Sequence, residues 1–177
     1  SCGLPALGVE VRLLSDTGSE AGCGELGEVV VRSDFLMSSY WGMSPEESGI
    51  HEGWLHTGDM ATHDASGYIY IVDRKKDMIN SGGENIYPKE IEDVLYIHPA
   101  VKEAAVIGVP DEKWGEAVVA VVAGMDGLTM SDEEILAHCK KYLASYKKPK
   151  RIVWMEDIPK TSRGKIDKRK LKSELGR

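Results

Sequence analysis

The sequence has few of the residues that define several large classes of protein. Three of its 177 residues are cysteine, Cys2, Cys23 and Cys139, and no two of them form a C-x-x-C pair. A scattered, odd set of cysteines fits a reducing compartment better than a disulfide framework. No run approaches the ~20 apolar residues of a membrane-spanning helix, and the first residues lack the basic-then-apolar pattern of a secretion signal. We therefore expect a cytoplasmic protein that is neither secreted nor membrane-spanning.

Several familiar catalytic patterns are also absent. The sequence contains no G-x-x-x-x-G-K-[ST] loop for a triphosphate and no G-x-S-x-G turn for a nucleophilic serine. Its five histidines show no metal-ligand spacing with one another or with Cys139. We therefore expect no protein-bound metal and no nucleophilic hydrolysis, and any triphosphate must be held by other means.

The sequence does contain enough apolar residues for a core, and its charge is unevenly distributed. Hydrophobic residues make up 42% of the chain, charged residues 29%, and the formal net charge is −7. Residues 147–172, however, contain eleven Lys and Arg against three Asp and Glu. A basic segment on an otherwise acidic chain suits a small phosphorylated ligand, whereas the acidic remainder would repel nucleic acid. A solvated basic surface is the alternative interpretation.

The first 73 residues have the pattern of β structure. Alternating runs occur at residues 9–14, 27–32 and 67–72, and the turn signal at residues 15–18 predicts that the first two form a hairpin. Residues 34–53 are typical of a loop that contains a short capped helical turn. We therefore expect a β-rich subdomain over residues 1–73.

From residue 74 onward the pattern alternates between helices and strands. Ser131 and Glu134, for example, have the spacing of a helix-starting capping box. The predicted elements are a helix over residues 87–98, strands over 101–109 and 116–123, a helix over 131–142, a strand over 151–155 and a helix over 165–175. The fold class is therefore α+β: a β-rich subdomain, a connecting segment at residues 74–77, and a small α+β domain over residues 78–177.

Three glycine-containing segments could present polar groups to a ligand. A carboxylate at Asp59, in G-W-L-H-T-G-D just after a predicted strand, can bind the vicinal hydroxyls of a ribose or form a structural Asx turn. Gly82 and Gly83 let the backbone approach a ligand closely or form a plain tight turn. Lys165, after Gly164 in a polar loop, can reach a phosphate or an oxyanion, or can be a solvated lysine.

Taken together, these segments resemble the adenylate-forming superfamily, and within it the acyl-CoA synthetases that act on fatty and aryl acids. The run D-R-K-K-D-M-I-N-S-G-G-E-N-I-Y-P-K-E-I-E at residues 73–92 is similar to the hinge motif of that family almost letter for letter. The similarity extends from G-x-P-x-x-G-x-x-V at residues 3–11 to P-K-T-x-x-G-K-I at residues 159–166. It implies a ligase that converts a carboxylate and Mg-bound ATP to an acyl-adenylate and then transfers the acyl group to coenzyme A, releasing AMP.

The resemblance also implies roles for individual residues. Asp59 and Arg74 match positions that bind the ribose hydroxyls of the nucleotide, and Lys76 matches the hinge about which the C-terminal domain rotates between the two half-reactions. Lys165 matches the lysine that bridges the substrate carboxylate and the α-phosphate during adenylation. The positions that match the coenzyme A site are Gly82, Gly83 and Glu84 at the pantetheine tunnel, Trp114 beside pantetheine, and Lys148 and Lys150 near the phosphates.

The phosphate loop, the aromatic-x-x-Thr-Glu motif and the acyl pocket of the family are not in this sequence. We therefore expect the C-terminal third of such an enzyme, unable to adenylate by itself, with the rest of the enzyme as its partner and a homodimer as an open alternative. Two other functions stay open, a non-catalytic interaction fragment and an adenylation domain of a peptide synthetase that loads a carrier protein. Residues 83–86 lack the arginine usual in the latter, which favours coenzyme A. The acid, fatty or aryl, is not specified.

Overall fold

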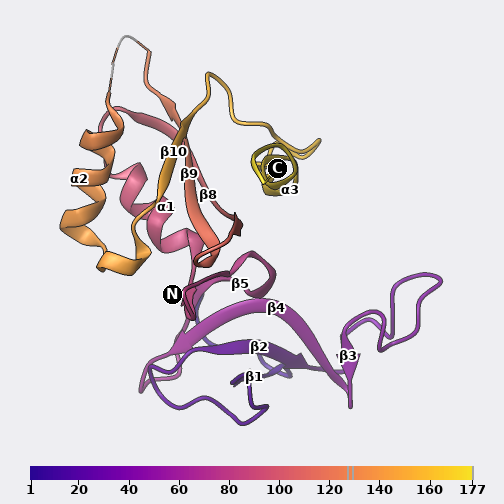
Figure 1. The fold of residues 1–177 in the computed structure, drawn as a ribbon. Helices are drawn as coiled ribbons and strands as arrows, with labels where there is room; N and C mark the ends of the chain where they lie inside the picture. Colours follow the sequence, from indigo (N-terminus) through magenta and orange to yellow (C-terminus); the bar gives the residue numbers. More distant parts are fainter. Residues whose placement is uncertain (127, 129, 177) are drawn as a thin grey trace. The chain divides into compact units, whose positions relative to one another are not determined.

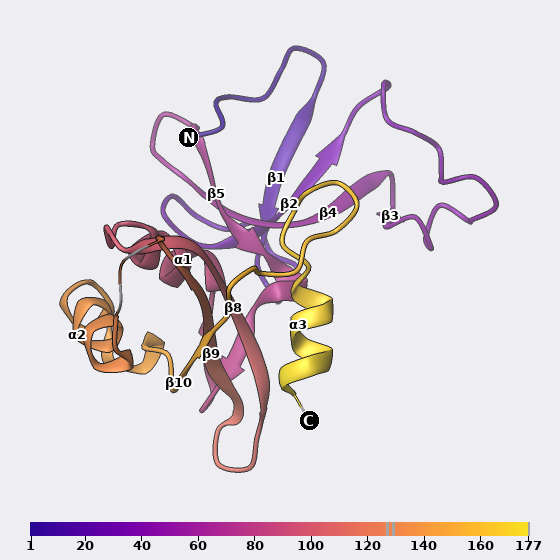
Figure 2. The same cartoon turned by 90° about the horizontal axis from the view of Figure 1, so that it is seen from above.

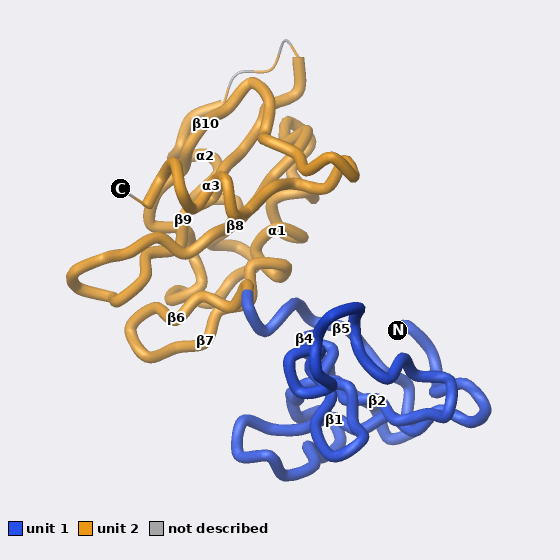
Figure 3. Tube along the Cα trace, turned by 90° about the vertical axis from the view of Figure 1, so that its right-hand side faces the viewer, with its two compact units in different colours: residues 1–76 blue, residues 77–177 orange. Residues whose placement is uncertain are grey.

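The computed structural model describes residues 1–126, 128 and 130–176. The chain divides into two compact units, Ser1–Lys76 and Asp77–Arg177, which are coloured separately in Figure 3. The division lies within the segment 74–77 that the sequence predicts to connect two domains. Rotation about this segment stays a prediction.

The first unit is built on an antiparallel sheet. Its strands are β1 (Glu10–Leu14), β2 (Gly27–Arg32), β3 (Ile50–His51), β4 (Trp54–His63) and β5 (Ile69–Arg74), seen in Figure 1. They are hydrogen-bonded in the order β1-β2-β4-β3, with β5 also on β4. β1 and β2 pair as predicted, but residues 15–26 join them in a longer connection than a tight turn.

The second unit is a mixed sheet covered by helices on both faces. Its strands are β6 (Ile79–Ser81), β7 (Glu84–Ile86), β8 (Val101–Asp111), β9 (Gly115–Gly124) and β10 (Arg151–Trp154). Its helices are α1 (Pro88–Tyr96), α2 (Asp132–Tyr142) and α3 (Lys168–Leu175), with single 3₁₀ turns η1 (Lys75–Asp77), at the boundary of the two units, and η2 (Ser145–Lys147). Figures 1 and 2 show α1 and α2 on one side of β8 and β9, and α3 on the other. The predicted α+β class is confirmed.

Two hydrophobic clusters hold this unit together because β8 and β9 are buried on both faces. Residues 117–123 read A-V-V-A-V-V-A and lack the polar alternation of a half-exposed strand. Ile91 and Leu95 of α1 pack with Ile135 of α2 on one face. Leu171 of α3 packs with Ile158 on the other. The helices are therefore fixed to the sheet by apolar burial at several points.

Helix ends follow local capping rather than the apolar pattern alone. The capping box at Ser131 and Glu134 is present, so this prediction is confirmed. The last helix begins three residues later than predicted because the Asp167 carboxylate accepts a hydrogen bond from the Lys170 N–H and caps the helix there. Ser44 and Glu47 also bond reciprocally, and the Ser48 N–H donates to the Ser44 carbonyl at 3.1 Å, so the short capped helical turn predicted in this loop is present. No helix among the described residues is long and apolar enough to cross a membrane.

Candidate functional site

The two candidate ribose ligands lie directly opposite each other on neighbouring strands. Asp59 of β4 pairs with Arg74 at the end of β5, and Arg74 Nε lies 3.0 Å from Asp59 Oδ1. Both side chains are partly exposed, which leaves the carboxylate accessible. The expectation that Asp59 directly follows a strand is wrong, since β4 continues through it to His63. Gly58, with a φ of 73°, interrupts the regular β conformation just before it.

A hollow of about 410 Å³ adjoins this ion pair. It is lined by Thr57, Gly58, Arg74, Lys75 and Lys76. Three of these five residues are cationic, so the hollow favours an anionic ligand. Lys76, the predicted hinge residue, is exposed at its edge.

Glu28 anchors the lining of this hollow and is a residue that sequence reasoning missed. Lys75 Nζ donates to Glu28 Oε2 at 3.0 Å, and the Gly58 N–H donates to Glu28 Oε1 at 3.2 Å. His56 Nδ1 lies 3.4 Å from Glu28 Oε2. Burial by itself raises the pKa of Glu28, but the hydrogen bonds from Lys75 and His56 outweigh it and hold the pKa below its usual value. A carboxylate inside the apolar run of residues 27–31 was the available signal.

The glycine pair forms the tight turn of a hairpin in the second unit. Gly82 and Gly83 have φ values of 64° and 85°, between the paired residues Ser81 and Glu84 of β6 and β7. Two successive left-handed residues make the turn that fits the twist of a β-hairpin, and glycine adopts it without strain. The flanking strands went unpredicted because three residues each are too few to show alternation.

Trp114 lies against this turn. The Gly82 N–H donates to the Trp114 carbonyl at 2.8 Å, and a Cβ added at Gly82 would lie 2.8 Å from Trp114 Cε3. Lys150 Nζ and Lys113 Nζ each lie 4.7 Å from the centre of the Trp114 ring. The structure thus brings together residues from three separate sequence motifs.

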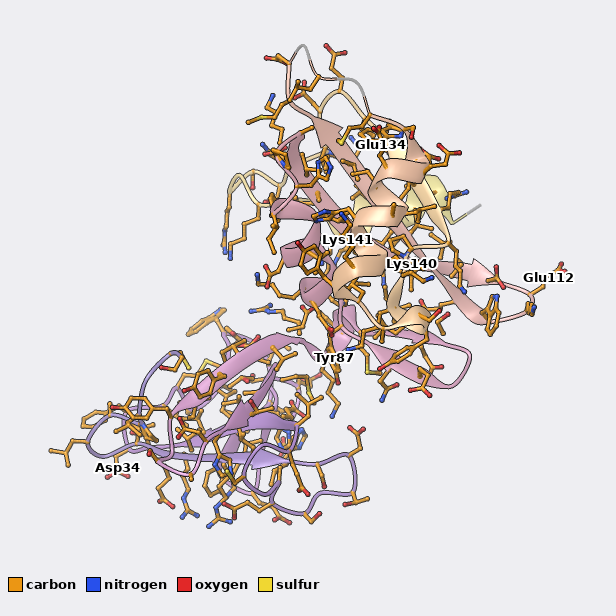
Figure 4. All side chains as sticks on the ribbon, turned by 90° about the vertical axis from the view of Figure 1, so that its left-hand side faces the viewer. Asp34, Tyr87, Glu112, Glu134, Lys140 and Lys141 are labelled. Atoms are coloured by element: carbon orange, nitrogen blue, oxygen red, sulfur yellow. The ribbon has the colours of Figure 1, made fainter. Side chains whose placement is uncertain are left out.

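A second hollow, of about 350 Å³, lies beside α2. Lys148 and Lys150 line it, and so does Lys140, which Figure 4 labels on α2 and which sequence reasoning missed. Its remaining lining residues are Leu136, Ala137, Ser145 and Pro149. Three lysines together with Leu136, Ala137 and Pro149 suit a ligand with both phosphates and an apolar or aromatic part. Lys140 lacked a sequence signal because only folding brings α2 to the segment after η2.

Lys165 lies at the end of a small hydrogen-bonded hairpin, the lysine hairpin, formed by residues 159–167. The Thr161 N–H donates to the Lys165 carbonyl at 2.7 Å, and the Gly164 N–H donates to the Thr161 carbonyl at 2.9 Å. Gly164 has a φ of 76°, as the turn requires. The Lys165 side chain is exposed and forms no ion pair within the described part of the chain. A cation is therefore held on an ordered turn and is available to a ligand.

The candidate residues are divided between the two units. Asp59, Arg74 and Lys76 belong to the first, and Lys165 belongs to the second together with the glycine turn, Trp114 and the lysines of the second hollow. In residues 1–126, 128 and 130–176, no three His, Cys, Asp or Glu side chains are grouped as metal ligands. The Asp59–Arg74 ion pair and its cationic hollow therefore lie on the first unit, and the exposed Lys165 and the lysine-lined hollow lie on the second.

Residues 90–165 match the family model described as AMP-binding enzyme C-terminal domain. The chain belongs to the adenylate-forming enzymes. It is 46% identical over 99% of its length to a feruloyl-CoA synthase from Amycolatopsis sp, and 46% identical over 98% to a long-chain-fatty-acid–CoA ligase from Yersinia pestis. It covers 36% and 31% of those proteins, about a third of their length. A crystal structure of ATP-bound MatB from Rhodopseudomonas palustris matches 98% of the chain with a TM-score of 0.91 at 35% identity, and the chain covers 35% of it.

Proposed function

We propose that this chain is part of an AMP-forming acyl-CoA synthetase and that it serves both half-reactions of that enzyme. The observation that carries the proposal is the cluster formed by the Gly82-Gly83 turn, the Trp114 ring and Lys150. A flat ring beside a glycine turn can border a narrow channel for the pantetheine arm, and the nearby lysines suit the phosphates of coenzyme A. If the thiol acceptor were a carrier protein, the hollow lined by Lys140, Lys148 and Lys150 would have no small phosphorylated ligand to bind. We therefore prefer coenzyme A as the acceptor.

In the adenylation step, a carboxylate attacks the α-phosphate of ATP, so two negatively charged groups are brought together and charge builds up on the oxygens of the five-coordinate phosphorus. The exposed ammonium of Lys165 can stabilise both together, and Asp59 with Arg74 can hold the ribose. Mg-bound ATP is the proposed nucleotide, with the magnesium supplied by the ATP complex. Pyrophosphate leaves and an acyl-adenylate forms.

In the thioester step, the thiol of coenzyme A attacks the acyl carbon and AMP leaves. Lys165 is not needed in this step, whereas the glycine turn and Trp114 are. Because Lys165 and the glycine turn lie in the same unit, rotation of that unit about Lys76 would exchange one for the other. The names of the relatives indicate either an aryl acid or a long-chain fatty acid as substrate. We further propose a cytoplasmic location, and a homodimer as an open alternative.

Two assays of the full-length enzyme containing this chain test the proposal. Carboxylate-dependent exchange of labelled pyrophosphate into ATP reports adenylation, and coenzyme A-dependent release of AMP reports the thioester step. Both should occur with ferulate or with a long-chain fatty acid, and the 177-residue chain alone should show no exchange. Exchange that proceeds with coenzyme A giving no thioester would overturn the choice of acceptor.

A further inference from the structure

The lysine hairpin is closed by its own hydrogen bonds, and an ion pair near each end attaches it to the rest of its unit. At its base, the Asp167 N–H donates to the Pro159 carbonyl at 2.8 Å, and Lys160 bridges to Ile166 in antiparallel fashion. These bonds close the hairpin on itself, but they do not fix its direction relative to the sheet. Its direction depends on contacts outside residues 159–167.

One such contact is an ion pair between Lys168, the residue immediately after the hairpin, and Glu92 of α1. Lys168 Nζ lies 2.7 Å from Glu92 Oε1, with 21% of the lysine side chain and 14% of the glutamate side chain exposed. The same oxygen accepts the Val106 N–H of β8 at 2.8 Å. A carboxylate that also bonds to a strand backbone cannot follow the lysine freely, so Lys168 is tied to a fixed point on the sheet.

A second contact ties down the other end of the hairpin. Lys160 Nζ donates to Glu103 Oε1 of β8 at 2.6 Å. This pair is more exposed than the first, with 45% and 26% of the side chains accessible, so solvent screening weakens it more. The two acceptors lie on different elements, α1 and β8, and each bonds one side of the segment that carries Lys165.

We infer that Glu92, through Lys168, is a positioning residue that fixes the lysine hairpin so that Lys165 reaches its place in the adenylation step. The inference rests on the proposed function, since it presupposes that Lys165 acts in adenylation. Glu92 itself touches no reacting atom. Removal of the ion pair lets the hairpin sample other directions, and a misplacement of about 1 Å can cost up to a hundredfold in rate.

A purely structural role is the competing explanation, because Glu92 also caps the free edge of β8. The two explanations differ in which half-reaction suffers. A positioning role affects adenylation alone, since the glycine turn and Trp114 do not contact the lysine hairpin in any described interaction. Loss of the β8 edge would instead impair the whole unit, and both half-reactions with it.

The test uses Glu92→Gln and Lys168→Met in the full-length enzyme. Glu92→Gln keeps an oxygen for the Val106 N–H but removes the negative charge. We expect each variant to lower kcat for pyrophosphate exchange about tenfold, with KM for ATP unchanged. Thioester formation from supplied acyl-adenylate should proceed at the parent rate. Lys168→Arg, which keeps the charge, should restore most of the exchange, and the double variant should be no worse than either single one.

A matched control comes from the same helix. Asp93→Asn removes the exposed ion pair of Asp93 with Lys89, which does not involve the hairpin. This variant should leave pyrophosphate exchange unchanged. Amide hydrogen exchange in the 177-residue chain gives a direct readout. Glu92→Gln should accelerate exchange at Thr161 and Asp167 while the amides of β9 keep their protection.

Any of three results in Glu92→Gln would overturn the inference. The first is an equal loss of both half-reactions, which would assign the residue to the support of β8. The second is an unchanged pyrophosphate exchange, and the third is an unchanged amide hydrogen exchange in the hairpin. Failure of the proposed function can be told apart from failure of this inference, because Lys165→Ala would retain adenylation if the proposed function were wrong. If Lys165→Ala abolishes adenylation and Glu92→Gln has no effect, the positioning role alone is wrong.

Discussion

The Lys75 ammonium lies 3.0 Å from the Glu28 carboxylate, 47 residues earlier in the chain, and this pair ties the end of β5 to β2. Lys75 immediately precedes the predicted hinge residue Lys76. The glutamate side chain is only 11% exposed, so the pair is better shielded from solvent than an ordinary surface ion pair. The first unit thus holds the chain firmly one residue before the point where rotation is expected.

Glu28→Gln should destabilise the first unit, by about 1–3 kcal/mol, because the Lys75 and Gly58 contacts lose their charged, largely buried acceptor. The pKa of Glu28 is lowered in the folded state from an ordinary value of 4.5. Its contribution to stability is therefore fully present above pH 4.5 and is lost as the pH falls through the lower folded value. The groups facing it are Lys75 and His56, with Asp16 3.9 Å from Lys75.

Urea denaturation of the 177-residue chain between pH 3 and pH 7 measures this effect. The difference in unfolding free energy between the parent and Glu28→Gln should be constant near neutral pH and shrink in acid. Glu25→Gln is a suitable control, since Glu25 is exposed and its carboxylate accepts a hydrogen bond from the neighbouring Gly22 N–H. A difference that does not change with pH would contradict the assignment.

Gly82→Ala should impair the thioester step and destabilise the second unit. The substitution forces a left-handed φ of 64° on alanine, at about 1–2 kcal/mol, and also places its Cβ 2.8 Å from Trp114 Cε3. Gly83→Ala separates these two effects because it has a similar φ of 85° but no heavy atom within 4 Å of the added Cβ. Tryptophan fluorescence and coenzyme A-dependent AMP release should change more in Gly82→Ala. Equal changes in the two variants would show that crowding against Trp114 is irrelevant.

Lys165→Ala in the full-length enzyme should reduce pyrophosphate exchange by about 10²–10³, as expected when a charge contact to the transition state is removed. Thioester formation from supplied acyl-adenylate should be spared. Arg163→Ala, in the same exposed turn, controls for a general loss of positive charge. Equal loss in both half-reactions would refute a role confined to adenylation.

Lys140→Met should weaken coenzyme A binding about fivefold, the order of magnitude of a single exposed charge contact. The adjacent Lys141→Met is the matched control. It removes the same charge from the same helix, but Lys141 does not line the second hollow; Figure 4 labels both lysines. Calorimetric titration of the full-length enzyme with coenzyme A at two salt concentrations measures the effect. The two variants should differ at low salt and converge at high salt.

The sequence predicted the three helices and the strands β1, β2, β5, β8, β9 and β10 because their signals are local. Proline at the start of α1, the capping box of α2 and the apolar run of β9 each act within a few residues. The β6–β7 hairpin escaped prediction, as did β3 and the full extent of β4. The hairpin depends on non-local pairing, since Ser81 bridges to Gly115 of β9. The short strands have no signal of their own apart from the glycine turn.

The candidate site residues divide in the same way, into those with a local sequence signal and those without one. Its candidate residues came from motifs, because each motif is contiguous in sequence. Glu28 and Glu92 were missed because each takes on its role only through a partner far along the chain, Lys75 and Lys168 respectively. Charged residues on a helix or strand ordinarily belong to its solvated face, and only the low exposure of these two glutamates marks them as different. Lys140 is exposed like any surface lysine, and only the fold shows that it lines a hollow with Lys148 and Lys150.

The antiparallel bridge between Lys160 and Ile166 restricts which sequence changes the lysine hairpin tolerates. Ile166 packs against the core beneath α3, so its neighbour Lys165 must face outward. Removing or adding one residue between Gly164 and Ile166 would turn the lysine toward the core and the isoleucine toward water. Ser162 and Arg163 at the exposed tip can be exchanged for other residues without that consequence. Homologous chains should therefore have different residue types at these two positions but the same number of residues in the turn.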